Sequence, residues 1–174
     1  RESGSFLETP APKPYRTVSL NSETEYVISR SRFIGRCFPV SDEQEALSIL
    51  ERIRKQHWDA THNCFAYRLR NGAARYSDDG EPQGTAGVPA LEAIRKSGVT
   101  DCVVVVTRYF GGILLGAGGL VRAYSTAAKM AVDAAKIVTY STYRQFDLVL
   151  LRKRADFLTQ FVIRHVFCVL EQAF

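Results

Sequence analysis

Two arginines flank a glycine-rich segment in the middle of the chain. Arg108 precedes this segment and Arg122 follows it. Its glycines are Gly111, Gly112, Gly116, Gly118 and Gly119. A glycine loop that leads into a helix exposes backbone N–H groups at the positive end of the helix dipole, and these groups favour an anion. Together with the fixed charge of the arginines, the pattern predicts a phosphate contact. Tyr109 could stack on a base, and Lys129 is a third basic candidate.

The glycines also have a purely structural interpretation. Val121 stands where a G-x-G-x-x-G dinucleotide motif would need its third glycine, and the chain has no Gly-Lys-Ser/Thr of a P-loop. A tight turn and close packing of a helix on a sheet require glycine just as an anion site does. The residues alone therefore leave the structural and the anion-binding role open on equal terms.

A second polar segment, residues 77–89, holds three carboxylates, three glycines and two prolines. Its acids are Asp78, Asp79 and Glu81. Paired carboxylates could hold Mg²⁺ or do acid–base work, but Asp and Glu beside Gly and Pro are also ordinary turn formers. No nucleophile and base with a recognisable spacing accompany them, so we assign no catalytic residue and no metal ligand. We expect an ordered loop in which at least one carboxylate pairs with Arg108 or Arg122.

His62 stands two residues before Cys64, a spacing that places both on one face of a strand. A thiol and an imidazole can form a nucleophilic pair, but no third group that would orient the histidine is evident. We therefore interpret His62 as a residue that supports the acidic loop. If Arg108 and Arg122 contact phosphate rather than this loop, we expect both to be surface residues whose replacement leaves the fold intact.

The elements that must position these residues follow from hydrophobic periodicity. Four consecutive valines, Val103–Val106, predict a fully buried strand. The period changes after the glycines, and residues 118–136 predict one alanine-rich helix. We expect the order strand, glycine loop, helix, with Phe110 in the core.

The flanking segments predict an α+β domain. Residues 15–40 have the pattern of strands, and Ser41 is placed to cap a helix. The apolar positions of that helix are Ala46, Leu47, Leu50 and Ile53. Asn71-Gly72 predicts the turn of a hairpin, and a further helix should begin within residues 85–89. Helices packed over one sheet are the expected architecture.

Composition and charge narrow the class of protein. The net charge of +5 and the pI near 9.1 permit an anionic partner, but the chain has no run of five basic residues, so folding must assemble any basic surface. No apolar run approaches the roughly 20 residues of a membrane helix. The four cysteines lack C-x-x-C spacing, which indicates reduced thiols in a cytoplasmic protein without a metal site. Residues 1–14, with three prolines, predict a flexible tail.

Four segments of the chain resemble motifs of the IMPACT family, whose bacterial members are the YigZ-type proteins. They are Ser31-Arg32-Phe33-Ile34, His62-x-Cys64-x-Ala66-Tyr67, the acidic segment 77–89 and residues 105–124. The resemblance implies that residues 15–139 form a ribosomal protein S5 domain 2-like domain. It also implies a role in translation, because eukaryotic relatives restrain a stress kinase that targets a translation initiation factor.

The resemblance predicts a second domain that is incomplete. Bacterial members usually append a ferredoxin-like domain similar to domain V of translocation factor G. Here residues 140–151 predict a linker and a first strand, and only 23 residues follow, whereas a full domain needs two helices and four strands. Residues 155–173 predict a helix or a mixture of strand and helix. We therefore expect residues 140–174 to form a partial ferredoxin-like domain.

Three functions are compatible with these patterns. The first is a translation-associated regulatory protein that binds RNA or the ribosome through the glycine-rich loop and a basic surface, with no cofactor. The second is a regulator of stress signalling that acts through a protein partner. The third is an enzyme that uses the glycine loop for a phosphorylated substrate, since small-molecule kinases share this fold.

Overall fold

The computed structural model describes residues 13–141, 148–154 and 157–163. The chain divides into two compact units, of which the larger runs from Lys13 to Tyr140. At the centre of this unit is a five-stranded sheet in the order β2-β3-β6-β4-β5, and all neighbouring strands are antiparallel. The strands are β2 (Ser22–Ile28), β3 (Ser31–Pro39), β4 (His62–Arg68), β5 (Ala74–Ser77) and β6 (Cys102–Tyr109).

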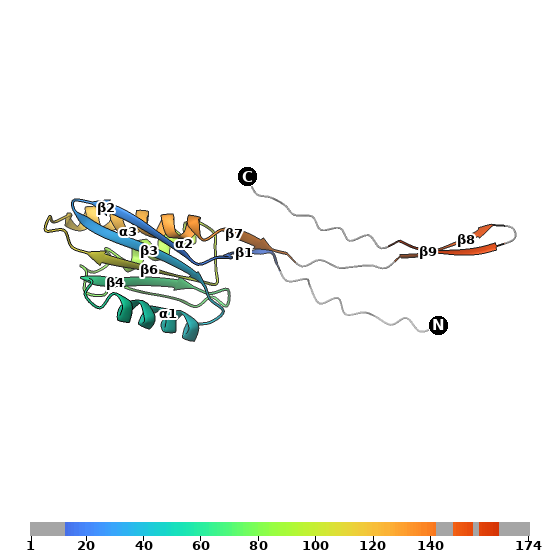
Figure 1. The fold of residues 1–174 in the computed structure, drawn as a ribbon, viewed down its shortest axis with the longest axis horizontal. Helices are drawn as coiled ribbons and strands as arrows, with labels where there is room; N and C mark the ends of the chain where they lie inside the picture. Colours follow the sequence, from blue (N-terminus) through green and yellow to red (C-terminus); the bar gives the residue numbers. More distant parts are fainter. Residues whose placement is uncertain (1–12, 142–147, 155–156, 164–174) are drawn as a thin grey trace. The chain divides into compact units, whose positions relative to one another are not determined.

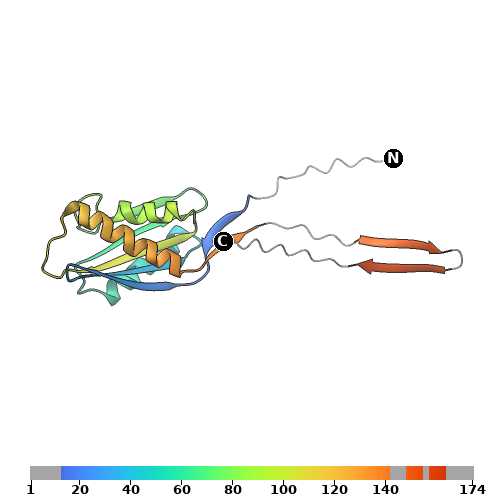
Figure 2. The same cartoon turned by 90° about the horizontal axis from the view of Figure 1, so that it is seen from above.

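Helices cover both faces of the sheet, so the unit is a mixed α/β fold with an antiparallel sheet. The helix α1 (Glu43–Gln56) lies on one face, and α2 (Gly87–Lys96) and α3 (Gly116–Ala134) lie on the other (Figures 1 and 2). β6 therefore contributes to two cores. Val104 and Val106 pack with α2 and α3, while Val103 and Val105 pack on the α1 side.

The predicted order of strand, glycine loop and helix is confirmed. Val103–Val106 lie within β6 and are completely buried. α3 begins at Gly116, two residues before the predicted start, and ends at Ala134. The predicted hairpin is also present, because β4 and β5 pair across a turn in which Gly72 has a φ of +94°.

Two local predictions were wrong. Asp42, not Ser41, caps α1: its carboxylate accepts a hydrogen bond from the Glu45 amide at 2.8 Å, while the Ser41 amide and hydroxyl donate to the Glu45 carboxylate. This differs from a regular capping box, because the side chain of the third helical residue, Glu45, binds the residue before the cap instead of the cap itself. Phe110, which was expected in the core, is 44% exposed because it follows the last residue of β6.

A two-stranded ribbon completes the larger unit. It pairs β1 (Tyr15–Val18) with β7 (Ile137–Tyr140), so the start and the end of the unit lie side by side. None of the helices in residues 13–141 has the length and hydropathy that a membrane span requires.

The other unit contains an antiparallel hairpin of β8 (Leu148–Arg154) and β9 (Phe157–Ile163). Of the two alternatives predicted for residues 155–173, the strand at Phe157–Ile163 excludes a helix throughout and is compatible with a mixture of strand and helix. The remaining residues of that prediction, and residues 1–12 of the predicted tail, lie outside the described residues.

Candidate functional site

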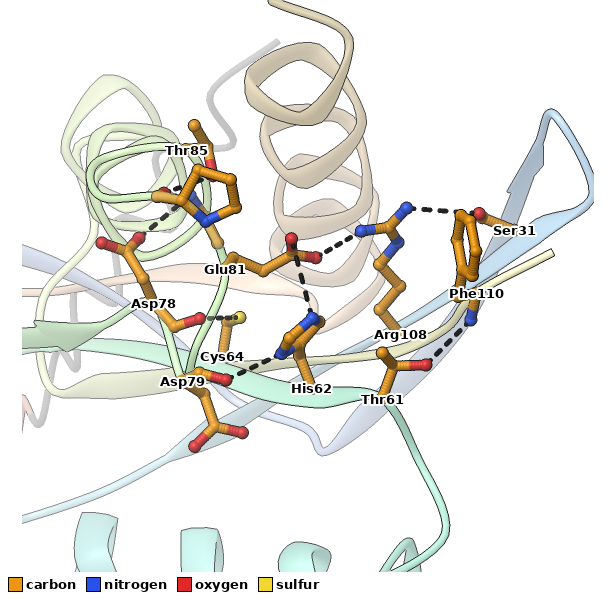
Figure 3. Close-up of polar contacts among 12 residues, drawn as sticks. Ser31, Thr61, His62, Cys64, Asp78, Asp79, Glu81, Thr85, Arg108 and Phe110 are labelled. Atoms are coloured by element: carbon orange, nitrogen blue, oxygen red, sulfur yellow. Dashed lines mark hydrogen bonds and ion pairs between the residues drawn. The ribbon is translucent and has the colours of Figure 1, made fainter. Parts of the chain in front are cut away.

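The acidic loop between β5 and α2 directs one carboxylate into the protein. The Glu81 side chain is 3% exposed and accepts hydrogen bonds from Arg108 Nη1 at 2.6 Å and from the Tyr124 hydroxyl at 2.8 Å. His62 Nε2 lies 3.7 Å from its second oxygen. Figure 3 shows Glu81 between His62 and Arg108, which both extend from the sheet. The predicted pairing of an acid of this loop with Arg108 is confirmed, and it links the loop to β4, β6 and α3.

Arg108 is an interior residue, whereas the predicted phosphate contact would place it at the surface. Its side chain is 6% exposed, and its guanidinium lies 5.4 Å from the ring centroids of Phe33 and Phe110. Besides Glu81 it approaches Ser31 Oγ at 3.4 Å, and its Nε has no hydrogen-bond partner within the part of the chain that the structure describes. Burial among aromatic rings and a carboxylate does not suit direct contact with a phosphate at the surface. Arg108 instead neutralises Glu81 inside the fold.

Asp78 organises the backbone of the same loop. Its carboxylate accepts hydrogen bonds from the amides of Gly84, Ala86 and Gly87 at 2.7–3.0 Å. Two of these amides stand at the N-terminus of α2, so Asp78 supplies the cap that the N-cap residue Ala86 lacks. Burial alone would raise the pKa of Asp78, but the three amide bonds outweigh it and leave the pKa below its ordinary value.

The depressed pKa of Asp78 predicts a pH dependence of stability. A carboxylate with a lowered pKa stabilises the fold fully above the pKa of the unfolded chain, about 3.8, and loses that contribution as pH falls through the folded value. We expect the unfolding free energy of the Asp78→Asn variant to fall less between pH 6 and pH 3 than that of the wild type. Urea denaturation at a series of pH values measures this free energy. An equal fall with pH for the wild type and the variant would contradict the prediction.

Asp79 and His62 anchor the loop to the sheet and to α1. The Asp79 carboxylate accepts hydrogen bonds from the Asn63 amide and from Arg54, both at 2.7 Å. His62 Nδ1 lies 2.8 Å from the Asp79 carbonyl oxygen. These contacts agree with the supporting role predicted for His62. The acids of this loop thus bind backbone amides, arginines and a tyrosine. Among the described residues, no three His, Cys, Asp or Glu side chains are grouped to share a metal ion.

Cys64 lies beside this network but is a poor nucleophile. Its Sγ donates to the Asp78 carbonyl oxygen at 3.0 Å, and the Tyr124 hydroxyl is 3.4 Å away. Burial raises the pKa of the thiol far above its ordinary value, so the thiol stays protonated at neutral pH. Cys37 and Cys102 are also buried and free, whereas Cys168 lies outside the described residues.

The glycine loop itself presents an open helix end. Gly116, Ala117 and Gly118 at the start of α3 are exposed, and the N-cap residue Leu115 makes no side-chain cap. The first turn of α3 contains no acid. A methyl group on Gly118 would lie 3.7 Å from Arg122 Nη1, so this exposed guanidinium folds back toward the same turn. The structure thus places Arg122 beside Gly118, one of the predicted amide donors, whereas a methyl group on Gly116 would have no neighbour within 4 Å.

Other predicted site residues have separate roles. Gly111 packs so tightly against the Arg30 backbone that a Cβ would overlap it, whereas Gly112 is open and has a φ of +85°. Lys129 pairs with Asp133 and lies thirteen residues along α3 from Gly116, which is about 20 Å. Lys129 therefore does not join the helix end, and Gly111 serves the packing of the loop.

Tyr109 is held in a polar network on the other face of the sheet. Its hydroxyl donates to Asp59 at 3.1 Å and lies 2.9 Å from His57 Nδ1. Partial burial, followed by the nearby Asp59 carboxylate, raises the pKa of Tyr109. His57 in turn lies 2.7 Å from the buried Arg36, and burial lowers the pKa of His57.

Sequence reasoning missed several residues at this end of the sheet. Trp58 is 83% exposed in the segment between α1 and β4, and Thr61 in that segment accepts a hydrogen bond from the Phe110 amide. Ile113 and Leu114 are 44% and 87% exposed at the tip of the glycine loop. Large apolar side chains within a loop could have indicated an exposed surface, since loops run over the surface. The role of Tyr124 in the Glu81 network was also missed, although the hydroxyl of a buried tyrosine needs a partner.

Comparison with known proteins places this site in a family. The sequence model of a protein family, the Impact N-terminal domain, matches residues 29–132, which is more than half of the chain. This range includes Glu81 and its partners His62, Arg108 and Tyr124. A solved structure titled "Crystal structure of an hypothetical protein" superimposes with a TM-score of 0.70 at 34% identity. That match covers 75% of this chain and 65% of the other.

Two bacterial relatives agree with the family match. The IMPACT family member YvyE of Bacillus subtilis is 50% identical over 126 residues, which are 71% of this chain and 58% of that protein. The IMPACT family member YigZ of Escherichia coli is 42% identical over 109 residues, which are 60% of this chain and 53% of that protein. The chain thus spans little more than half the length of these relatives. It belongs to the IMPACT family.

Proposed function

We propose that this protein is a translation-associated regulatory protein that binds RNA, free or within the ribosome, through the N-terminus of α3. One observation carries the proposal: the first turn of α3 is exposed, lacks a side-chain cap and an acid, and has the Arg122 guanidinium beside it. Free amides at a helix N-terminus with an adjacent arginine are suited to a phosphate group. The regulatory role follows from the resemblance to family members that act on translation.

Exposed aromatic rings at this end of the sheet would add stacking to the phosphate contact. Phe110 and Trp58 are large and exposed, and Thr61 joins their two segments by a hydrogen bond to the Phe110 amide. Single-stranded nucleic acid binds where a positive surface lies near aromatic side chains, and stacking contributes about 1–3 kcal/mol per base. Arg108 supports this surface from inside, by holding the acidic loop next to α3.

The test is the affinity of a single-stranded RNA oligonucleotide, measured by fluorescence anisotropy at several salt concentrations. We expect Arg122→Gln to weaken binding and to reduce the slope of log affinity against log salt by about 0.7, the value for one phosphate contact on a single strand. Lys129→Gln is the matched control, because it removes one exposed positive charge about 20 Å along α3 from Gly116. Trp58→Ala should weaken binding without a change in slope.

The same titrations contain the outcome that would refute RNA binding by this surface. An affinity and a salt slope that Arg122→Gln and Trp58→Ala leave unchanged, in variants with wild-type circular dichroism, would mean that α3 does not contact RNA. Sedimentation of each variant with ribosomes repeats the comparison in the larger assembly.

A second candidate is a regulator that binds a protein partner through the tip of the glycine loop. The observation that favours it is the exposure of two adjacent aliphatic side chains, Ile113 at 44% and Leu114 at 87%. Aliphatic side chains at a loop tip suit an apolar pocket of another protein better than a base. Binding to a stress-signalling partner that Leu114→Ser abolishes, while Arg122→Gln has no effect, would favour this candidate over RNA binding.

A further inference from the structure

A pocket at the opposite end of the sheet is lined by three arginines. They are Arg68 at the end of β4, Arg70 in the turn before β5, and Arg95 in the last turn of α2. The pocket has a volume of about 380 Å³, and Thr100 from the segment between α2 and β6 forms part of its wall. Three arginines that are up to 27 positions apart in the sequence thus line one space.

The partners of the arginines leave most of their donors unused. Arg68 Nη1 donates to the Val99 carbonyl oxygen at 3.3 Å, and Arg95 Nη1 donates to Glu92 at 2.7 Å. Arg70 lies over the Tyr15 ring and is 3.9 Å from Asp101. Since a guanidinium carries five N–H donors, each side chain keeps several for a ligand. No carboxylate lines the pocket itself, and its three cations outnumber the two neighbouring acids.

We propose that this pocket binds the phosphoryl group of a phosphorylated ligand. Arginine forks match the oxygens of phosphate in pairs. A tetrahedral phosphate with several terminal oxygens can accept from donors that approach from three directions, whereas a planar carboxylate offers only two oxygens. The volume falls in the range of small-ligand sites, so the phosphate can be carried by a nucleotide-sized molecule or by the end of an RNA strand.

The pocket is separate from the surface proposed to bind RNA. Arg68 pairs with Cys102 at the start of β6, whereas the glycine loop follows Tyr109 at its end. Seven residues of strand separate the two ends by roughly 23 Å. The phosphoryl pocket therefore does not rest on the proposed function, and variants at one site should leave the other unchanged.

The test titrates the 174-residue protein with sodium pyrophosphate, with adenosine monophosphate, and with an RNA oligonucleotide in 5′-phosphorylated and 5′-hydroxyl forms. Isothermal titration calorimetry on the wild type should show saturable binding of a phosphorylated probe. Arg95→Gln should weaken it about tenfold, as expected for a lost hydrogen bond to a charged group. Arg75→Gln is the matched control, because Arg75 is a similarly exposed arginine of β5 that pairs with Glu43 outside the pocket.

The pattern of outcomes decides the proposal and identifies the source of the phosphate. Binding of pyrophosphate or the mononucleotide that Arg95→Gln weakens, and that Arg75→Gln leaves unchanged, supports the pocket with a small ligand. The same pattern only for 5′-phosphorylated RNA supports the pocket with a strand end. The proposal would be overturned if no probe showed saturable binding. It would also be overturned if Arg75→Gln and Arg95→Gln lost the same affinity for the probe. In each supporting case, Arg122→Gln should bind the pocket probe like the wild type.

Discussion

Replacing Glu81 with alanine should cost about 3–5 kcal/mol of unfolding free energy, the range for a buried ion pair that loses one partner. The carboxylate is the only acid paired with Arg108 among the described residues, and both side chains are almost fully buried. Without it the guanidinium remains in the interior between two aromatic rings, and the Tyr124 hydroxyl loses its acceptor. Urea denaturation followed by circular dichroism measures the loss.

Asp133→Ala is the matched control for this prediction. Lys129 and Asp133 form an ion pair with the same 2.6 Å separation, but both side chains are at least half exposed. Solvent screening limits such a pair to about 0.5 kcal/mol, so the control should remain close to wild type. If Glu81→Ala cost no more than Asp133→Ala, the ion pair between the acidic loop and β6 would not be a main support of the fold.

Replacing Gly35 with alanine should destabilise the protein by about 3 kcal/mol, at the upper end of typical overpacking costs. Gly35 lies in β3 directly beneath α3, and a Cβ there would overlap the Ala127 carbonyl oxygen and lie 3.3 Å from Ala131 Cβ. Neither neighbour is a flexible side chain that could turn away. The helix must therefore move from the sheet, which disturbs the core between them. The midpoint of urea denaturation should fall accordingly.

A second glycine-to-alanine change separates this clash from a general effect of the substitution. Gly118 lies in α3, where nothing but the end of the Arg122 side chain is near an added methyl group. Alanine is the better helix former by up to about 1 kcal/mol, so Gly118→Ala should leave stability unchanged or raise it. Similar losses in both variants would refute the close contact of β3 with α3.

Local sequence patterns were sufficient to predict the main helix and strands that surround the site. The valine run predicted β6, the alanine-rich period predicted α3, and Asn71-Gly72 predicted the hairpin of β4 and β5. Each signal depends only on neighbours within a few residues, through helix propensity, side-chain periodicity or the backbone freedom of a glycine. The cap of α1 was misplaced by one residue because Ser41 and Asp42 are both good caps, and the choice between them depends on their bonds to Glu45.

The orientation of Arg108 could not be read from the sequence. β6 is covered by helices on both faces, so its valines carry no alternation that shows which face the next polar residue will meet. In the fold, Arg108 lies on the same face as Val104 and Val106, under the acidic loop and beside α3. The same residue at the end of an edge strand would be solvated and free to bind an anion.

The sequence by itself therefore determined which charged groups and loops the protein has. The tertiary structure decided which of these groups are buried and which are accessible to a ligand. The sequence identified the acidic loop, the glycine loop and the pairing of an acid of the first with an arginine that flanks the second, because opposite charges stabilise each other. It did not indicate that Arg108 would be buried while Arg122 stays exposed, or that Arg68, Arg70 and Arg95 would line one pocket. Burial and convergence depend on how distant elements pack, and no spacing within one segment encodes that.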